Sequence, residues 1–343
     1  MNGKKIILTV VCCALAAILA AAFLIPRGGK NPEGDGAEPV RKLICTTYPV
    51  YLLVRDVAKG GPVRPELLLP PDTGCPHDYS LTPGDLMKLS GGRTLLIRNG
   101  LGLDDSLWET ALSANPKLKS IALAEGISGV IHEEEDDDDD DDDHEEHADH
   151  GHEAAESCTD PECGHHHHHH HHGHENGHLF ASPDTAAEMV KNAVQALSGF
   201  DPENASLYEK NGKKIQAELL ALAGEFRSAG LTGRKIAVQH DIYAYLARLC
   251  GMEMEVSLRA EESQSLSPAL IARLCKQIRE KKVTVLYAEP QYSKETAELI
   301  AREAGIAYSV LDPCASGPAD PEHGYYQKVM RKNLETLRGG NGK

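Results

Sequence analysis

Four residues that are far apart in the chain have side chains that can hold a divalent metal ion: His77, His178, His240 and Asp312. Each is predicted to lie close to the end of a strand or the start of a helix, where binding groups usually project from a fold. Imidazole nitrogens and a carboxylate oxygen suit a tetrahedral Zn²⁺ ion, with ligand distances of roughly 2.0–2.2 Å. Because Zn²⁺ has no geometric preference from its d electrons, distant segments can supply these ligands. Together the four residues predict one zinc site in a cleft.

An acidic and histidine-rich segment lies between the first two of these residues. Residues 132–178 contain nineteen Asp and Glu residues and no Lys or Arg, whereas the whole chain has a net charge of −17. This composition cannot bury enough apolar surface to offset the entropy of ordering, so it predicts a disordered loop over 132–177. The loop supplies a predicted second, low-affinity set of metal ligands: His144, His147, His150, His152, His165, His166, His167, His168, His169, His170, His171, His172 and His174.

The rest of the chain alternates between predicted strands and helices. The strands are predicted at 43–46, 64–69, 94–97, 120–123, 235–238, 283–287 and 306–311. Helices are predicted between most of them, and the longest runs from about 202 to 226, long enough to connect two lobes. The predicted fold is therefore α/β: two pseudo-symmetric lobes joined by one long rigid helix, with the metal site in the cleft between them.

The predicted domains follow from these patterns and from the N-terminus. Lys4 and Lys5 precede an apolar stretch from 6 to 25, which is long enough to span a bilayer and longer than the usual apolar region of a signal peptide. Two fates stay open for this stretch, an uncleaved membrane anchor or a cleaved signal, and in both the rest of the chain faces outward. The predicted parts are a signal peptide or anchor (1–27), a spacer (28–40), an N-terminal lobe (41–201), an interlobe helix (202–228) and a C-terminal lobe (229–343).

Several cysteines also lie near the predicted cleft. Cys45, Cys75 and Cys314 are each close in sequence to a predicted cleft position. Disulfides or incidental small residues are one interpretation, and metal binding by Cys75 is the other. Cys158 and Cys163, inside the loop, form either a disulfide or a secondary thiolate site. Thiolate ligands would favour Zn²⁺ or Cu⁺ over Mn²⁺.

Several separated strings resemble one known family. The string PPDTGCPHDYSLTPGDLMKL, followed by NGLGLDDSLW, is similar to the first metal-ligand region of the zinc/manganese solute-binding proteins of ABC importers. QHDIYAYLARLCG, YAEPQYS, and LDP followed by YYQKVMRKNLETL resemble that family in the same order, and DPENASLYEKNGKKIQAEL resembles its interlobe helix. The resemblance extends from about Arg41 to Leu337, and a long His-rich loop is typical of the zinc-type members.

The resemblance implies that the ligands are His77, His178, His240 and Asp312. The family usually shows Asp-Pro-His before the second ligand, whereas this chain has Asn176-Gly177-His178. His174 is the alternative at that position, although it lies further from the following helix. His323, in a loop before the last helix, is predicted to be exposed and outside the site.

The function that the resemblance implies is extracytoplasmic capture of Zn²⁺ with high affinity and its delivery to the membrane permease of an ABC transporter. Four protein ligands would leave no position for an activated water, and no HExxH motif is present, so we do not expect an enzyme. Zn²⁺ is the expected transported ligand rather than Mn²⁺, because manganese-selective relatives tend to have a carboxylate in place of His240. We expect a monomer and no nucleic-acid partner, since no basic stripe is present. The alternatives are a manganese- or iron-binding importer subunit, and a surface metal store or adhesin.

Overall fold

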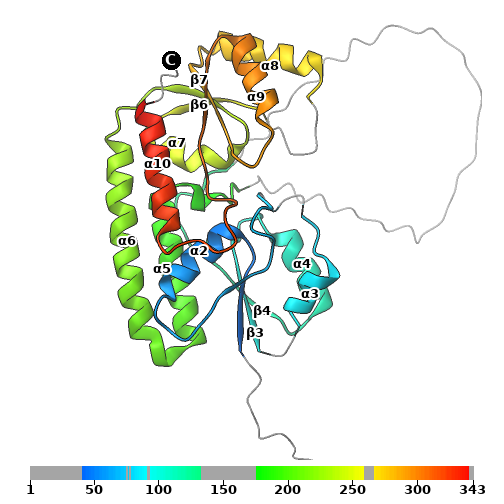
Figure 1. Ribbon diagram of the computed structural model, residues 1–343, viewed down its shortest axis with the longest axis vertical. Helices are drawn as coiled ribbons and strands as arrows, with labels where there is room; N and C mark the ends of the chain where they lie inside the picture. The colour runs from blue at the N-terminus through cyan, green and yellow to red at the C-terminus, as the bar shows by residue number, and fades with distance from the viewer. Residues whose placement is uncertain are drawn as a thin grey trace, which may run out of the picture. The chain divides into compact units, whose positions relative to one another are not determined.

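The computed structural model describes residues 41–74, 76, 79–90, 93–132, 175–258 and 266–339. The described residues after Arg41 form two parallel sheets of four strands each, with helices packed against them (Figure 1). This agrees with the predicted two-lobed α/β class. None of the helices in the described ranges has the length and hydropathy needed to cross a membrane. The apolar stretch from 6 to 25 lies outside these ranges.

The N-terminal sheet has the strand order β2-β1-β3-β4. Its central pair is in register from Lys42 opposite Thr94 to Cys45 opposite Ile97. Its strands are β1 (Lys42–Cys45), β2 (Glu66–Leu67), β3 (Thr94–Arg98) and β4 (Lys119–Ala122). Its helices are α2 (Tyr48–Val57), α3 (Pro83–Lys88) and α4 (Asp105–Ala114). All four strands were expected from the sequence, with shifted ends.

The C-terminal sheet repeats this arrangement with the order β6-β5-β7-β8. Its strands are β5 (Lys235–Val238), β6 (Glu253–Ser257), β7 (Val285–Ala288) and β8 (Ala307–Val310). Its helices are α7 (Ala244–Cys250), α8 (Pro268–Glu280) and α9 (Lys294–Ala304). In both sheets the first strand of the lobe lies second in the order, so the two lobes share one topology. The sequence analysis missed β6, an edge strand with only one buried residue and therefore a weak apolar pattern.

Helices α5 (Pro183–Phe200), α6 (Ala205–Arg227) and α10 (Tyr325–Gly339) lie along one side of both lobes (Figure 1). Two short 3₁₀ turns, η2 (Leu179–Ala181) and η3 (Pro202–Asn204), precede α5 and α6, and a third, η4 (Asp241–Tyr243), precedes α7. Helix α10 follows the C-terminal sheet in sequence but packs against α6 and α2. One continuous hydrophobic cluster includes Val54 of α2, Leu219 of α6 and Val238 of β5. The two lobes therefore share a core, and each sheet has a separate cluster on its other face.

The packing of α5 on α6 depends on Gly212. A Cβ atom at this position would lie 2.2 Å from Cγ2 of Val194, so Gly212→Ala is expected to lower the free energy of unfolding by about 1–3 kcal/mol through overpacking. The matched control is Gly224→Ala in the same helix, where nothing lies within 4 Å of the added Cβ. Because alanine is the better helix former, that variant should be more stable by about 0.5–1 kcal/mol. Urea unfolding compares the two, and equal stabilities would contradict this account of the helix pair.

Candidate metal site

Polar side chains gather where the parallel strands end. Asn99 follows β3, His240 follows β5 after one residue, Glu289 follows β7, and Asp312 follows β8 after one residue. In open α/β sheets, ligands bind outside the carboxyl ends of the strands. Three of the four positions therefore belong to the C-terminal sheet, and Asn99 belongs to the N-terminal sheet.

His178 is buried, with 3% of its surface exposed, in the segment that leads into η2 and α5. Its backbone N–H donates to Oδ1 of Asn176 at 3.0 Å, and its ring Nδ1 lies 3.1 Å from the same oxygen. The ring of Phe180 meets the His178 ring edge-on, with 5.9 Å between centroids. The imidazole is thus held on two sides by its own segment.

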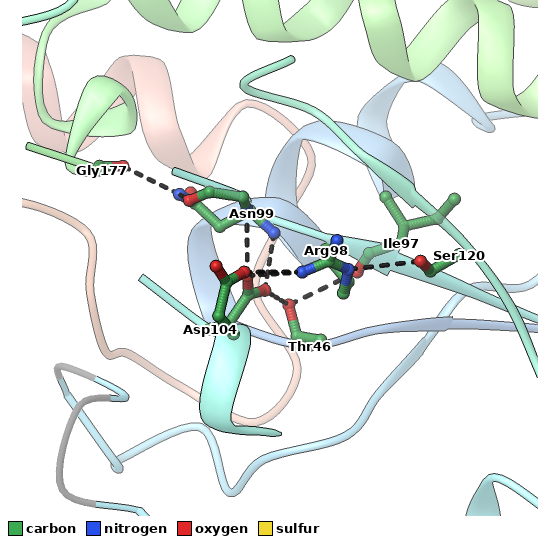
Figure 2. A network of polar contacts seen from close by, with 9 residues as sticks. Thr46, Ile97, Arg98, Asn99, Asp104, Ser120 and Gly177 are labelled. Carbon is green, nitrogen blue, oxygen red and sulfur yellow. Dashed lines mark hydrogen bonds and ion pairs between the residues drawn. The ribbon is translucent and has the colours of Figure 1, made fainter. Parts of the chain in front are cut away.

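A buried carboxylate organises the loop after β3, against which the segment carrying His178 is fastened (Figure 2). Asp104 is fully buried, and it accepts hydrogen bonds from Oγ1 of Thr46 at 2.6 Å, from N of Asn99 at 2.7 Å and from N of Gly100 at 3.0 Å. The amide of Asn99 then donates to the carbonyl oxygen of Gly177 at 2.8 Å. The N-terminal sheet therefore fixes the backbone next to His178.

His240 lies at the start of η4, and its ring contacts His178. The two ring centroids are 4.8 Å apart, with the planes at 89°. Behind the ring, Nδ1 of His240 lies 3.9 Å from Oε1 of Glu289, a carboxylate that is 1% exposed. Gln291 donates a hydrogen bond to the other oxygen of Glu289. Nδ1 and Oε1 are within the distance of an ion pair but too far apart for a hydrogen bond.

Asp312 is held by backbone contacts on both sides. Its N–H donates to Oδ1 of Asn333 on α10 at 3.0 Å, and its carbonyl oxygen accepts from Nδ2 of the same residue at 2.7 Å. Burial raises the pKa of the Asp312 carboxyl, and the N–H of Cys314, which donates to it at 2.8 Å, lowers it. Tyr243 of η4 donates to the carbonyl oxygen of Leu311 at 2.6 Å. That bond links the turn after His240 to the residue before Asp312.

The segment after Asp312 returns to the N-terminal lobe. His323 is exposed, as predicted, but its Nδ1 lies 2.7 Å from Oδ1 of Asp56 on α2. The other oxygen of Asp56 accepts from N of Gly324 at 2.9 Å, and Tyr48 donates to the carbonyl oxygen of Pro318 at 3.0 Å. His323 therefore takes part in a contact between the lobes, away from the histidine pair.

Of the predicted ligands, the structure brings His178 and His240 into direct contact. Asp312 lies at the end of the same sheet as His240, joined to the His240 turn through Tyr243. His77 and the thirteen predicted loop ligands lie outside the described residues, as do Cys75, Cys158 and Cys163. Within the described ranges, no three His, Cys, Asp or Glu side chains form a group that could hold a metal ion.

The described cysteines are buried and unbridged: Cys45, Cys250, Cys275 and Cys314. Burial raises the pKa of each of these thiols, that of Cys250 to about 12. A metal is bound by the thiolate rather than the thiol, so these four side chains are poor ligands. Disulfides or incidental small residues were the expectation for Cys45 and Cys314, and the structure shows both as buried residues without a disulfide.

Two residues next to the histidines were not assigned any role from the sequence. Glu289 belongs to YAEPQYS, and a carboxylate directly after a buried apolar strand could have been recognised as a candidate. Asn176 gave no such signal, because it stands at the edge of the acidic segment and its partners are distant in the chain.

The comparisons with known proteins agree on one family. The family model described as "Zinc-uptake complex component A periplasmic" matches residues 43–340. The chain is 29% identical over 338 residues to the high-affinity zinc uptake system protein ZnuA of Bacillus subtilis (strain 168), which covers 94% of this chain and 95% of that protein. It is 27% identical over 335 residues to the zinc-binding lipoprotein AdcA of Streptococcus pneumoniae serotype 4, covering 94% of this chain. The chain spans 60% of the length of that AdcA protein.

A solved structure shows the same fold. The chain is similar to the SBP FpvC of Pseudomonas aeruginosa in complex with Mn²⁺, with a TM-score of 0.68 and 21% sequence identity. The match covers 88% of this chain and 98% of that one. At this level of identity the similarity supports the two-lobed architecture alone.

Proposed function

This chain belongs to the zinc-uptake complex component A family, and on that premise we propose that it captures Zn²⁺ outside the cytoplasm and delivers it to the permease of an ABC importer. The observation that carries the proposal is the contact between two imidazoles from different lobes, the buried His178 and the partly buried His240. Two imidazoles placed side by side suit Zn²⁺, a cargo that this protein would bind and release unchanged.

We further propose that the ion is held by His77, His178, His240 and Asp312. The stretch that leads to His77 supports this arrangement, because it lies against the C-terminal lobe. A Cβ added at Gly74 would be 3.1 Å from Cγ of Gln291, the residue that donates to Glu289. Nearby, N of Gly317 donates to the carbonyl oxygen of Pro71 at 2.9 Å.

The ligand types favour zinc over manganese. Among divalent first-row ions Mn²⁺ binds nitrogen ligands most weakly, and it prefers sites rich in oxygen. In the proposed site, three of the four ligands are imidazoles. The loop histidines would add weaker sites that raise the local concentration of Zn²⁺ near the cleft. The chain would act as a monomer. It would not act as an enzyme, because the four protein ligands leave no position on the ion for a reacting water.

Release of the ion would involve modest movement of the lobes. The hydrophobic cluster that joins α2, α6 and β5 is continuous, so a wide opening would expose a shared core. We place the protein in the extracytoplasmic space, in line with the family's periplasmic description. Residues 1–27 would then serve as an anchor or be cleaved as a signal.

Uptake of ⁶⁵Zn tests the delivery step. Cells that carry the cognate permease but lack this chain are supplied with the wild-type chain or with His178→Ala, and uptake is followed at limiting zinc. Wild type should restore uptake, and His178→Ala should not. Equal uptake with both chains would show that the histidine pair does not handle the transported ion.

A further inference from the structure

The two ends of the acidic segment meet beside the histidine pair. We call Ile131, His132, Glu175 and Asn176 the loop stem. His132 and Glu175 form an antiparallel bridge, and N of Asn176 donates to the carbonyl oxygen of Ile131 at 2.8 Å. Tyr245 of α7 fastens both sides, since its hydroxyl donates to the carbonyl oxygen of Asn176 at 2.6 Å and accepts from N of Ile131 at 3.1 Å. The stem is therefore bound to the C-terminal lobe.

The side chain of Asn176 is 1% exposed and faces two partners of fixed polarity. The backbone N–H of His178 can only donate, so the amide atom 3.0 Å from it must be the oxygen. The carbonyl oxygen of Asp241 can only accept, so the atom 3.0 Å from it must be the NH₂ group. The two contacts agree on one orientation of the amide.

This orientation determines the tautomer of His178. Because Oδ1 of Asn176 is an acceptor, Nδ1 of His178, 3.1 Å away, must carry the proton of the neutral ring. The lone pair is then on Nε2, which is the nitrogen available to a metal ion. Hydrogen bonding at one ring nitrogen commonly selects the other as the ligand.

The same amide also holds the backbone beside the second histidine. Asp241, which accepts from Nδ2 of Asn176, directly follows His240. Gly177, between Asn176 and His178, packs closely on the loop after β3. A Cβ atom at Gly177 would lie 2.8 Å from the carbonyl oxygen of Leu101, so there is little room for this backbone to shift. Asn99 also donates to Gly177 (Figure 2). One buried side chain thus contacts the segments of both imidazoles and forms part of the loop stem.

We propose that Asn176 is the positioning residue of the zinc site: its oxygen sets the ring of His178, and its amide group sets the distance between the His178 and His240 segments. The inference rests on the proposed function, since it assumes that these histidines bind the ion. Removal of such a contact behind a ligand typically weakens metal binding by about 10–100-fold. Asn176 would also connect the stem of the His-rich segment to the cleft.

Two substitutions in the full chain separate positioning from packing. Asn176→Leu keeps a similar volume and loses all three polar contacts, to N and Nδ1 of His178 and to the carbonyl oxygen of Asp241. Zinc affinity at the tightest site should therefore fall by about 10–100-fold in competition with a chelator. Asn176→Asp keeps an oxygen acceptor for His178 but loses the donor to the carbonyl oxygen of Asp241, so its affinity should lie between those of the Leu variant and wild type. Long-range ¹H–¹⁵N NMR of the imidazoles reports the tautomer, which should be mixed at His178 only in the Leu variant.

Asn192→Leu is the matched control, because the amide of Asn192 also donates to two backbone carbonyl oxygens, those of Leu123 and Glu125, but is not part of the loop stem. Its zinc affinity should stay close to that of wild type. Wild-type affinity in Asn176→Leu, or an equal loss in Asn192→Leu, would overturn the positioning role. If instead the wild-type chain has no tight site that His178→Ala removes, the proposed function itself fails.

Discussion

His240→Ala is expected to weaken the tightest zinc site by about 100-fold or more, because it removes one of four proposed ligands. Zinc bound by four protein ligands contributes roughly 10–16 kcal/mol, so an average ligand contributes about 2.5–4 kcal/mol. The loss should be measured by competition with a chelator of known affinity, so that the weaker loop sites do not contribute.

The matched control for this variant is His323→Ala. His323 pairs with Asp56 and lies away from the histidine pair, so its removal should leave zinc affinity unchanged. A similar loss in both variants would mean that any change in histidine content lowers affinity. That result would argue against a localised site at His240.

Asp104→Ala is expected to lower the free energy of unfolding by about 3–5 kcal/mol, as is typical when one partner of a buried charged network is removed. Three donors would lose their acceptor, on Thr46, Asn99 and Gly100, in a place that water does not reach. Urea denaturation of the metal-free protein measures the change. Zinc affinity should fall as well, because Asn99 would no longer hold Gly177 in place.

Asp105→Ala tests whether burial is the reason for that effect. Arg98 lies 3.8 Å from the carboxylate of Asp104 and 2.9 Å from that of Asp105, the next residue. The side chain of Asp105, however, is 54% exposed. An exposed ion pair contributes about 0–1 kcal/mol, so this variant should lose little stability. Comparable destabilisation of the two variants would contradict the role given to the Asp104 network.

How much of the structure can be predicted from the sequence depends on how far apart in the chain the interacting residues lie. The strand at 235–238 is predicted with its observed bounds, because Lys235 is followed by three apolar residues and then by polar ones. Patterns of this kind are local, and they also place His240 and Asp312 at the ends of their strands. The edge strand β6 was missed because its side chains are mostly only partly buried, which removes the local signal.

The arrangement around the histidines could not be predicted in the same way. Asn176 contacts Asp241, and Asn99 contacts Gly177, pairs that are 65 and 78 residues apart in the chain. Such pairs are brought together by the tertiary fold and not by local sequence, so neither residue carries a local sign of its role. The glycine in place of the family's usual proline before the second ligand has a physical reason. Gly177 lies too close to the loop after β3 for a side chain.

The most direct test of the account is a calorimetric titration with Zn²⁺ of the chain in which residues 133–174 are replaced by two glycines, beside the same chain with His240→Ala. The account predicts one tight zinc site in the first protein, weak binding of Mn²⁺ to it, and loss of the tight site in the second. Absence of tight zinc binding once residues 133–174 are removed would contradict a site in the cleft. The protein would then be a metal store whose acidic, His-rich segment does the binding.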